Sequence, residues 1–196
     1  NNKVIIEAEG SINGNAYGGV TIDVGKVTGN EITNSGTVGG NIYGGRASTV
    51  DVENNILTMN EGSSTHLIGG YSKDGNSLAN VVKINGGIVA RNVYGGESGS
   101  GYTENNKVMM AGGSVNWLLG AYSKSGNVNR NTVEVTGGEI RGGISGGEST
   151  TGNVKGNKVN FNNISVDTIN GGYSASGNAN ENEVNIDSGT VNWIQG

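Results

Sequence analysis

An asparagine followed by alternating apolar residues recurs at nearly constant spacing along this chain of 196 residues. After a first occurrence at Asn2, the leading asparagines are 25 or 26 residues apart. They are Asn30, Asn55, Asn80, Asn106, Asn131, Asn157 and Asn182. A fixed period of roughly 20 to 50 residues is typical of solenoids, propellers and other repeat arrays. The chain is therefore expected to build one structural unit several times over.

Each unit contains three short apolar groups separated by glycines. The group that follows the asparagine, such as "NVVKI" at 80–84, alternates β-branched and polar residues, which favours a strand. A propeller blade needs about 40 residues and four strands, whereas roughly 25 residues with three strands fit one coil of a parallel β-helix. We therefore predict an all-β fold, a right-handed parallel β-helix (β-solenoid), with the hand taken from the strong preference of strand crossovers.

The composition also requires a thin, repeated interior, because 38 residues are glycine and only 33% are hydrophobic. We predict a single β-solenoid domain over 1–196, with an irregular first coil (1–29) and an incomplete last coil (182–196). The residues expected in its apolar columns are Val4, Ile6, Ile32, Leu57, Met59, Val82, Ile84, Val108, Met110, Val133, Val135, Val159, Phe161, Val184 and Ile186.

A second phrase recurs with twice the period. "GGYSKDGN" at 69–76, "GAYSKSGN" at 120–127 and "GGYSASGN" at 171–178 place their tyrosines 51 residues apart, so two coils form a super-repeat. Glycine pairs are expected to supply backbone conformations closed to other residues at the corners, and the following "DGN" or "SGN" is typical of a turn. The recurrent asparagines are expected to stack at a bend as a structural ladder of side-chain amides.

The single histidine, His66, falls at a variable position of the repeat. By counting from each leading asparagine, its equivalents are Arg91, Trp117, Gly142 and Trp193, among others. A catalytic histidine needs fixed partners within hydrogen-bonding reach, and the sequence supplies none, so a surface position is expected. We predict that the protein is not an enzyme and has no catalytic residues.

The acidic residues give no metal-binding pattern, because the aspartates recur at no common offset. Glu97 and Glu148 do align, 51 residues apart, with Arg46 near the corresponding place, and we interpret them as solvated charges at the edge of the fold. No metal and no cofactor are therefore predicted.

Exposed aromatic residues form the remaining candidate surface. The predicted contact residues are His66, Arg91, Trp117, Trp193, Tyr71, Tyr122 and Tyr173. Aromatic columns on a stiff rod can stack on sugar rings or pack against another rod. The alternative is that these side chains only cover glycine corners, and the sequence leaves both possibilities open.

The charge limits the partners. The formal net charge is −5, so no basic field is available for nucleic acid, and nucleic acid is not expected as a partner.

No apolar run is long enough to span a membrane, so this segment is not expected to insert into one. Because the sequence begins at Asn1 and ends within a coil, we expect a processed protein or an excerpt of a longer one, or end-to-end stacking of subunits.

The combination of the "NNKV", "VYGGES" and "GGYS" phrases resembles the repetitive passenger regions of bacterial autotransporters (type V secretion) and related large surface adhesins, over essentially the full chain. The resemblance implies export across the outer membrane and a stalk anchored through a part outside this segment. It further implies roles in adhesion, aggregation or biofilm formation. The serine-protease motif "GDSGS" of some passengers is absent.

The sequence therefore predicts a structural and adhesive rod of a bacterial cell-surface or extracellular protein. Its expected partners are other copies of itself, side by side or end to end, or a glycan or protein on a host or bacterial surface. The alternatives are a glycan-binding module that uses the aromatic columns and, less favoured because the loops between coils barely vary, a carbohydrate-active enzyme.

Overall fold

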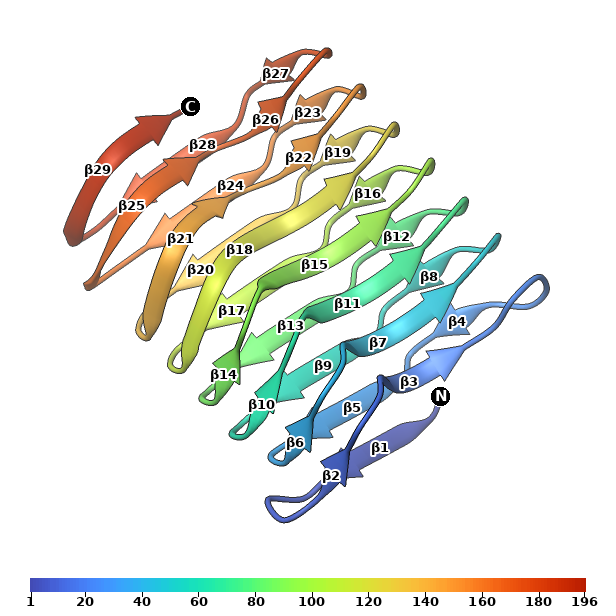
Figure 1. Cartoon of the computed structure of the whole chain (residues 1–196). Coiled ribbons are helices and arrows are strands. Elements are labelled where there is room, and N and C mark those ends of the chain that lie inside the picture. The colour runs from blue at the N-terminus through green and yellow to red at the C-terminus, as the bar shows by residue number, and fades with distance from the viewer.

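The computed structural model describes all 196 residues, and it is an all-β solenoid with three parallel sheets (Figure 1). Sheet A has eight strands and starts each coil. Its strands are β1 (Lys3–Ile6), β5 (Glu31–Asn34), β9 (Ile56–Met59), β13 (Val81–Ile84), β17 (Lys107–Met110), β20 (Thr132–Val135), β24 (Lys158–Phe161) and β28 (Glu183–Ile186). Neighbouring strands pair in parallel, one coil apart, as in Val82 beside Val108.

Sheet B, with fourteen strands, forms the second side of each coil, and sheet C, with seven, forms the third. Sheet B comprises β2 (Ser11–Ile12), β3 (Ala16–Val20), β6 (Thr37–Val38), β7 (Ile42–Ala47), β10 (Ser63–Ser64), β11 (Leu67–Ser72), β14 (Ile88–Val89), β15 (Asn92–Ser98), β18 (Ser114–Ser123), β21 (Glu139–Ser145), β22 (Glu148–Ser149), β25 (Ile164–Asn170), β26 (Tyr173–Ser174) and β29 (Gly189–Gln195). Sheet C comprises β4 (Val27–Thr28), β8 (Val52–Glu53), β12 (Ser77–Leu78), β16 (Thr103–Glu104), β19 (Val128–Asn129), β23 (Val154–Lys155) and β27 (Ala179–Asn180).

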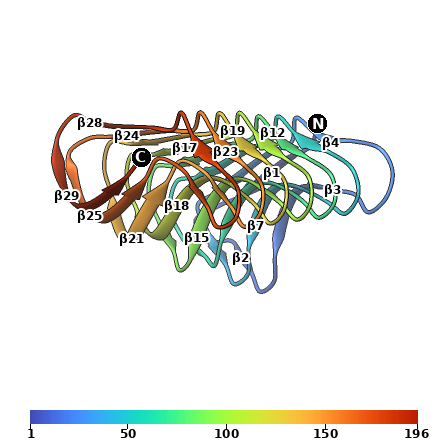
Figure 2. The same ribbon diagram turned by 90° about the horizontal axis from the view of Figure 1, so that it is seen from above.

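The coils wind in the right-handed sense. In Figure 1 the long sheet B strands, such as β7 and β11, cross the front toward the right, and sheet A returns behind them toward the left. The chain meanwhile climbs from its N-terminus at the lower right to its C-terminus at the upper left. In Figure 2, seen from above, sheet B strands such as β15 and β18 lie along the lower part of the picture, and sheet A strands such as β24 and β28 lie along the upper part. The predicted parallel β-helix is therefore confirmed.

The interior is a single thin core that runs the length of the rod. A continuous cluster of 24 buried hydrophobic residues joins the inward side chains of sheets A and B, such as Leu57, Val82 and Leu118. Most of the residues predicted for the apolar columns lie in it, whereas Val4 and Val184 are only partly buried. Ile186, in the last coil, is 39% exposed, so its predicted burial was wrong. No coil lies above it to cover its side chain.

The leading asparagines form a buried ladder along the axis. For example, the Asn106 side-chain oxygen accepts hydrogen bonds from the backbone N–H of Asn80 (2.9 Å) and from its side-chain amide (3.0 Å). The Asn106 amide donates in turn to the Asn131 side-chain oxygen (3.0 Å) and to the Ser77 carbonyl (2.9 Å). All the hydrogen-bonding capacity of such a side chain is thereby used, as a buried polar group requires. The same amide-to-oxygen bond links successive members from Asn2 to Asn182.

A left-handed residue directly before each ladder asparagine makes the bend between sheets C and A. This position has a positive φ throughout, for example 50° at Ala79 and 56° at Asn105. Glycine occupies it only at Gly29 and Gly156. The single left-handed residue turns the chain sharply, so the next side chain points into the stack of coils, where the ladder forms.

The glycine pairs of sheet B have a different role from the one predicted. Gly95 and Gly96 lie within β15, and neither has a positive φ. A Cβ atom at Gly96 would instead lie 2.5 Å from the Asn106 Cγ, so the absence of a side chain there makes room for the ladder. A Cβ atom at Gly95 would collide first with the carbonyl oxygen of Gly120 in the next coil, so this glycine lets the backbones of neighbouring coils approach closely. The backbone freedom of glycine is used elsewhere, as at Gly87, where φ is 83°.

The rest of the repeated phrase closes the turn between sheets B and C. The Ser123 hydroxyl donates to the Gly101 carbonyl of the preceding coil (2.8 Å) and accepts from the Gly126 backbone N–H (2.9 Å). Equivalent bonds are made by Ser72, Ser149 and Ser174. Among the non-glycine residues of "GGYS", only the tyrosine therefore has its side chain outside.

None of the elements of this structure is a helix of the length and apolar character that a membrane span requires.

Candidate functional site

The outer face of sheet B carries three parallel columns of side chains, because inward glycine pairs interrupt the strand alternation. In β11 and the residue before it, His66, Ile68 and Tyr71 face outward, while Leu67 and Ser72 are fully buried. The first column contains Asn15, Asn41, His66, Asn92, Trp117, Gly143, Thr168 and Trp193. The second contains Tyr17, Tyr43, Ile68, Tyr94, Leu119, Ser145, Asn170 and Gln195, and the third contains Val20, Arg46, Tyr71, Glu97, Tyr122, Glu148 and Tyr173.

The register corrects one part of the predicted contact surface. Asn92, not Arg91, pairs with Trp117, and Gly143, not Gly142, follows Trp117 in the next coil. Arg91 lies in the preceding turn, where its side chain is exposed. Val89 and Val93 pair with Ser64 and Leu67 of the coil that contains His66, and one more residue lies between the first two than between the second two, so counting from the leading asparagine misplaces Arg91.

Tyrosines of the second column are held upright by asparagines of the first. The amide groups of Asn15, Asn41 and Asn92 donate to the hydroxyl oxygens of Tyr17 (3.1 Å), Tyr43 (3.0 Å) and Tyr94 (2.8 Å). The rings of Tyr17 and Tyr43 also stack, with centroids 5.2 Å apart. These tyrosines were not among the predicted contact residues. The "N-x-Y-G-G" pattern, which occurs at 15–19, 41–45 and 92–96, was the sequence signal that could have found them.

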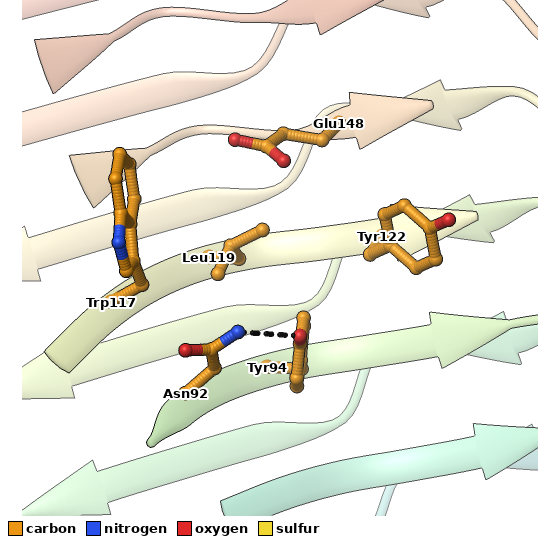
Figure 3. A pocket seen from close by; sticks show the side chains of 6 residues that line it. All are labelled: Asn92, Tyr94, Trp117, Leu119, Tyr122 and Glu148. Carbon is orange, nitrogen blue, oxygen red and sulfur yellow. Dashed lines mark hydrogen bonds between the residues drawn. The ribbon is translucent and has the colours of Figure 1, made fainter. Parts of the chain in front are cut away.

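Two hollows form where this second column has an aliphatic residue in place of a tyrosine. The Leu119 hollow has a volume of about 270 Å³ and is lined by Asn92, Tyr94, Trp117, Leu119, Tyr122 and Glu148. In Figure 3 Leu119 lies between Trp117 on the left and Tyr122 on the right. Glu148 is above it, and the hydrogen-bonded pair of Asn92 and Tyr94 is below it. Leu119 is nearly fully buried and so forms the floor.

Trp117 is fixed in place by the coil that follows it. A Cβ atom at Gly142 would lie 2.6 Å from the indole Cδ1, and one at Gly143 would lie 2.7 Å from the indole Cζ3. The indole therefore covers this glycine pair with one part of its surface and borders the Leu119 hollow with another. Of the two roles considered for the tryptophans, covering glycine and lining a surface site, Trp117 has both. Trp193, in the last coil, is 72% exposed and borders neither hollow.

The Ile68 hollow, of about 310 Å³, lies one super-repeat earlier. Its lining consists of Asn41, Tyr43, Arg46, His66, Ile68, Tyr71, Tyr94 and Glu97. His66, Ile68 and Tyr71 lie one 51-residue period before Trp117, Leu119 and Tyr122, and Tyr94 borders both hollows. The Arg46 guanidinium is 5.9 Å from the centre of the Tyr43 ring and 5.6 Å from that of Tyr71, within the range of a cation–π contact.

The two glutamates of the third column are not the solvated edge charges that the sequence indicated. Glu97 lies between Tyr71 and Tyr122 of the neighbouring coils, and Glu148 lies between Tyr122 and Tyr173. Both are half-buried. Burial raises the pKa of Glu97 to about 7. Burial also raises the pKa of Glu148, against the opposing effect of a hydrogen bond from Ser145.

His66 is a wall of its hollow. Its ring stacks on that of Tyr94, with the ring centroids 6.2 Å apart, and its Nδ1 accepts a 3.3 Å hydrogen bond from the backbone N–H of Asn92. Burial, with the nearby charge of Arg91, holds the pKa of His66 below its ordinary value, which favours the neutral ring at pH 7. No group of three His, Cys, Asp or Glu residues is close enough to hold a metal ion.

Comparisons of the chain with protein-family models, with curated proteins and with solved structures find no significant match. The resemblance to autotransporter passenger regions therefore stays a prediction from the sequence.

Proposed function

We propose that the protein is a non-catalytic adhesive rod segment of a bacterial cell-surface or extracellular protein, and that the outer face of sheet B contacts its partner. The observation that carries this proposal is the pair of aromatic-walled hollows that line up on one face of the rod. Concave sites with aromatic walls and a few polar groups are typical of binding surfaces.

The regularity of the coils supports a role as a stiff spacer. The ladder asparagines and the parallel pairing of each sheet link every coil to the next along the whole chain. In such solenoids each repeat is stabilised mainly by its neighbours, so the rod can present a surface at a distance from its anchor. The export and anchoring of this rod are proposed from the sequence resemblance alone.

The placement of the carboxyl groups on this face supports binding over hydrolysis. A glycoside hydrolase that uses two carboxyl groups holds them on either side of one scissile bond. Here Glu97 lines the Ile68 hollow and Glu148 lines the Leu119 hollow, and Tyr122 lies between them in the column.

Adhesion of the purified, fluorescently labelled protein to bacterial and host cells tests the proposal. A variant of the sheet B face, Tyr71→Ser with Tyr122→Ser, should lose at least tenfold in binding. The matched control is Met109→Ser with Lys83→Ser on the outer face of sheet A, where both side chains are exposed and pair in register. Equal binding by the two variants, or no binding by the unmodified protein to any cell or to itself, would contradict the proposal.

A further inference from the structure

The 51-residue super-repeat gives the sheet B face two equivalent hollows in line with the rod axis. Each has an aliphatic floor, Ile68 or Leu119, and a tyrosine of the repeated phrase as one wall, Tyr71 or Tyr122. Floors in alternate coils are two strand spacings apart, or roughly 9.6 Å along the axis. Tyr94 stands between them and belongs to both linings.

The walls offer the two kinds of surface that a pyranose ring needs. The C–H groups on one side of a sugar ring form an apolar face that packs on an aromatic ring, and Trp117 and Tyr122 present such rings. The hydroxyl groups at the rim of a sugar need hydrogen-bonding partners. The Glu148 carboxyl and the Asn92 amide lie at the edges of the Leu119 hollow in the positions to supply them.

The charge of the face favours a neutral ligand. Glu148 is the only ionisable acid or base apart from tyrosine in the Leu119 hollow, and the lining of the Ile68 hollow contains one carboxyl group, Glu97, together with Arg46 and His66. The whole protein carries a formal net charge of −5. An acidic polymer would therefore be repelled by the negative charge of the protein over most of its path, whereas a ligand with uncharged hydroxyl groups meets no such repulsion.

We propose that the two hollows are consecutive subsites for one neutral, linear glycan that lies along the solenoid axis over Tyr94. This inference rests on the proposed function, for which it names the ligand class. An extended chain of pyranose rings advances by about one strand spacing per ring, so the hollows take alternate rings, and a trisaccharide is the shortest ligand that reaches both. Binding in two linked subsites strengthens affinity beyond that of either alone.

The test measures affinity against oligomer length. The probes are neutral β-1,4-linked glucose and N-acetylglucosamine oligomers of two to six residues, with oligogalacturonides of the same lengths as the acidic comparison. Isothermal titration calorimetry should show a gain of at least tenfold between disaccharide and tetrasaccharide for a neutral series. The fluorescence of Trp117, followed in a Trp193→Phe background, should change on binding because its indole borders the site.

Variants that fill the hollows keep the test independent of folding defects. Leu119→Tyr copies the residue that the chain itself uses at the equivalent positions of Tyr17, Tyr43 and Tyr94. This variant should reduce tetrasaccharide affinity to that of the disaccharide, and Leu119→Tyr with Ile68→Tyr should abolish binding. Trp117→Ala should weaken binding at least tenfold, while its matched control in the same column, Trp193→Ala, should not change it.

Affinity that does not depend on oligomer length, tighter binding of the acidic series, or unchanged binding by Leu119→Tyr would each overturn the inference. Cell adhesion that is lost in the Tyr71 and Tyr122 variant without any glycan binding would overturn the glycan assignment and leave the adhesive face in place. Self-association that Leu119→Tyr abolishes would assign the hollows to a second copy of the chain instead.

Discussion

The side chains of Asn80 and Asn106 lie next to each other in consecutive coils. The Asn80 amide donates a 3.0 Å hydrogen bond to the Asn106 side-chain oxygen. Both side chains are buried, and each continues the chain of bonds to the next coil. A buried amide of this kind stabilises the fold only while all its partners are present, since an unpaired buried polar group is costly.

Asn106→Ala should therefore lower the free energy of unfolding by roughly 3–5 kcal/mol, because it leaves bonding groups of Asn80, Asn131 and Ser77 without partners. Urea denaturation followed by circular dichroism measures the loss. The control is Asn85→Ala, whose side chain makes a similar 2.9 Å bond to Asn60 at an exposed position, and it should cost less than about 1 kcal/mol. Similar losses for the two variants would contradict the role given to burial.

A side chain at Gly96, which faces the ladder, is also expected to destabilise the fold. Gly96→Ala would place a methyl group 2.5 Å from the Asn106 Cγ, so it should destabilise the protein by roughly 2–3 kcal/mol through displacement of that side chain. Gly14→Ala has no atom within 4 Å of the new Cβ and serves as the control. Thermal unfolding should separate the two by several degrees, and a tolerant Gly96 would mean that the ladder can move aside.

The serine of the repeated phrase is predicted to hold the turn between sheets B and C. Ser123→Ala removes a donor to the Gly101 carbonyl and an acceptor for the Gly126 N–H, at a fully buried position, and should cost roughly 1–3 kcal/mol. Ser125→Ala breaks one exposed bond to Gly99 and should have little effect. Amide hydrogen exchange should show faster opening around Gly126 in the first variant alone. Unchanged protection there would remove the serine from this role.

Glu97 should make stability depend on pH. Its pKa is about 7 in the folded protein and near its ordinary value of 4.5 in the unfolded chain. Between these values the folded state holds a proton that the unfolded state has released, so stability falls as pH rises from about 4.5 to about 7. Above this window the cost of the buried charge is fully present.

Glu97→Gln removes this cost. With allowance for partial exposure, the variant should exceed the unmodified protein in unfolding free energy by roughly 1–2 kcal/mol at about pH 8, and the two should be nearly equal at about pH 4. Urea titrations at the two pH values provide the measurement, with the exposed Glu61→Gln as the control. A difference that is independent of pH would indicate a packing effect instead of a titrating carboxyl group.

The sequence by itself determined the coil. The spacing of the asparagines and the alternation of residues such as Val82 and Ile84 depend only on the local period of a strand, so they revealed the three-stranded unit, the stacking and most of the core. The same local information indicated that the tyrosines of the repeated phrase face outward.

Only the tertiary structure decided which outward residues meet. One additional residue in a single coil moved Asn92 into the place that counting had assigned to Arg91, because strands align by their hydrogen bonds and not by distance from a landmark. The hollows over Ile68 and Leu119 exist because a shorter side chain stands among larger ones contributed by neighbouring coils. The burial of Glu97 likewise depends on Tyr71 and Tyr122, each about 25 residues away in sequence and adjacent in space. Such relationships depend on register and on the volumes of neighbouring side chains, which no local pattern contains.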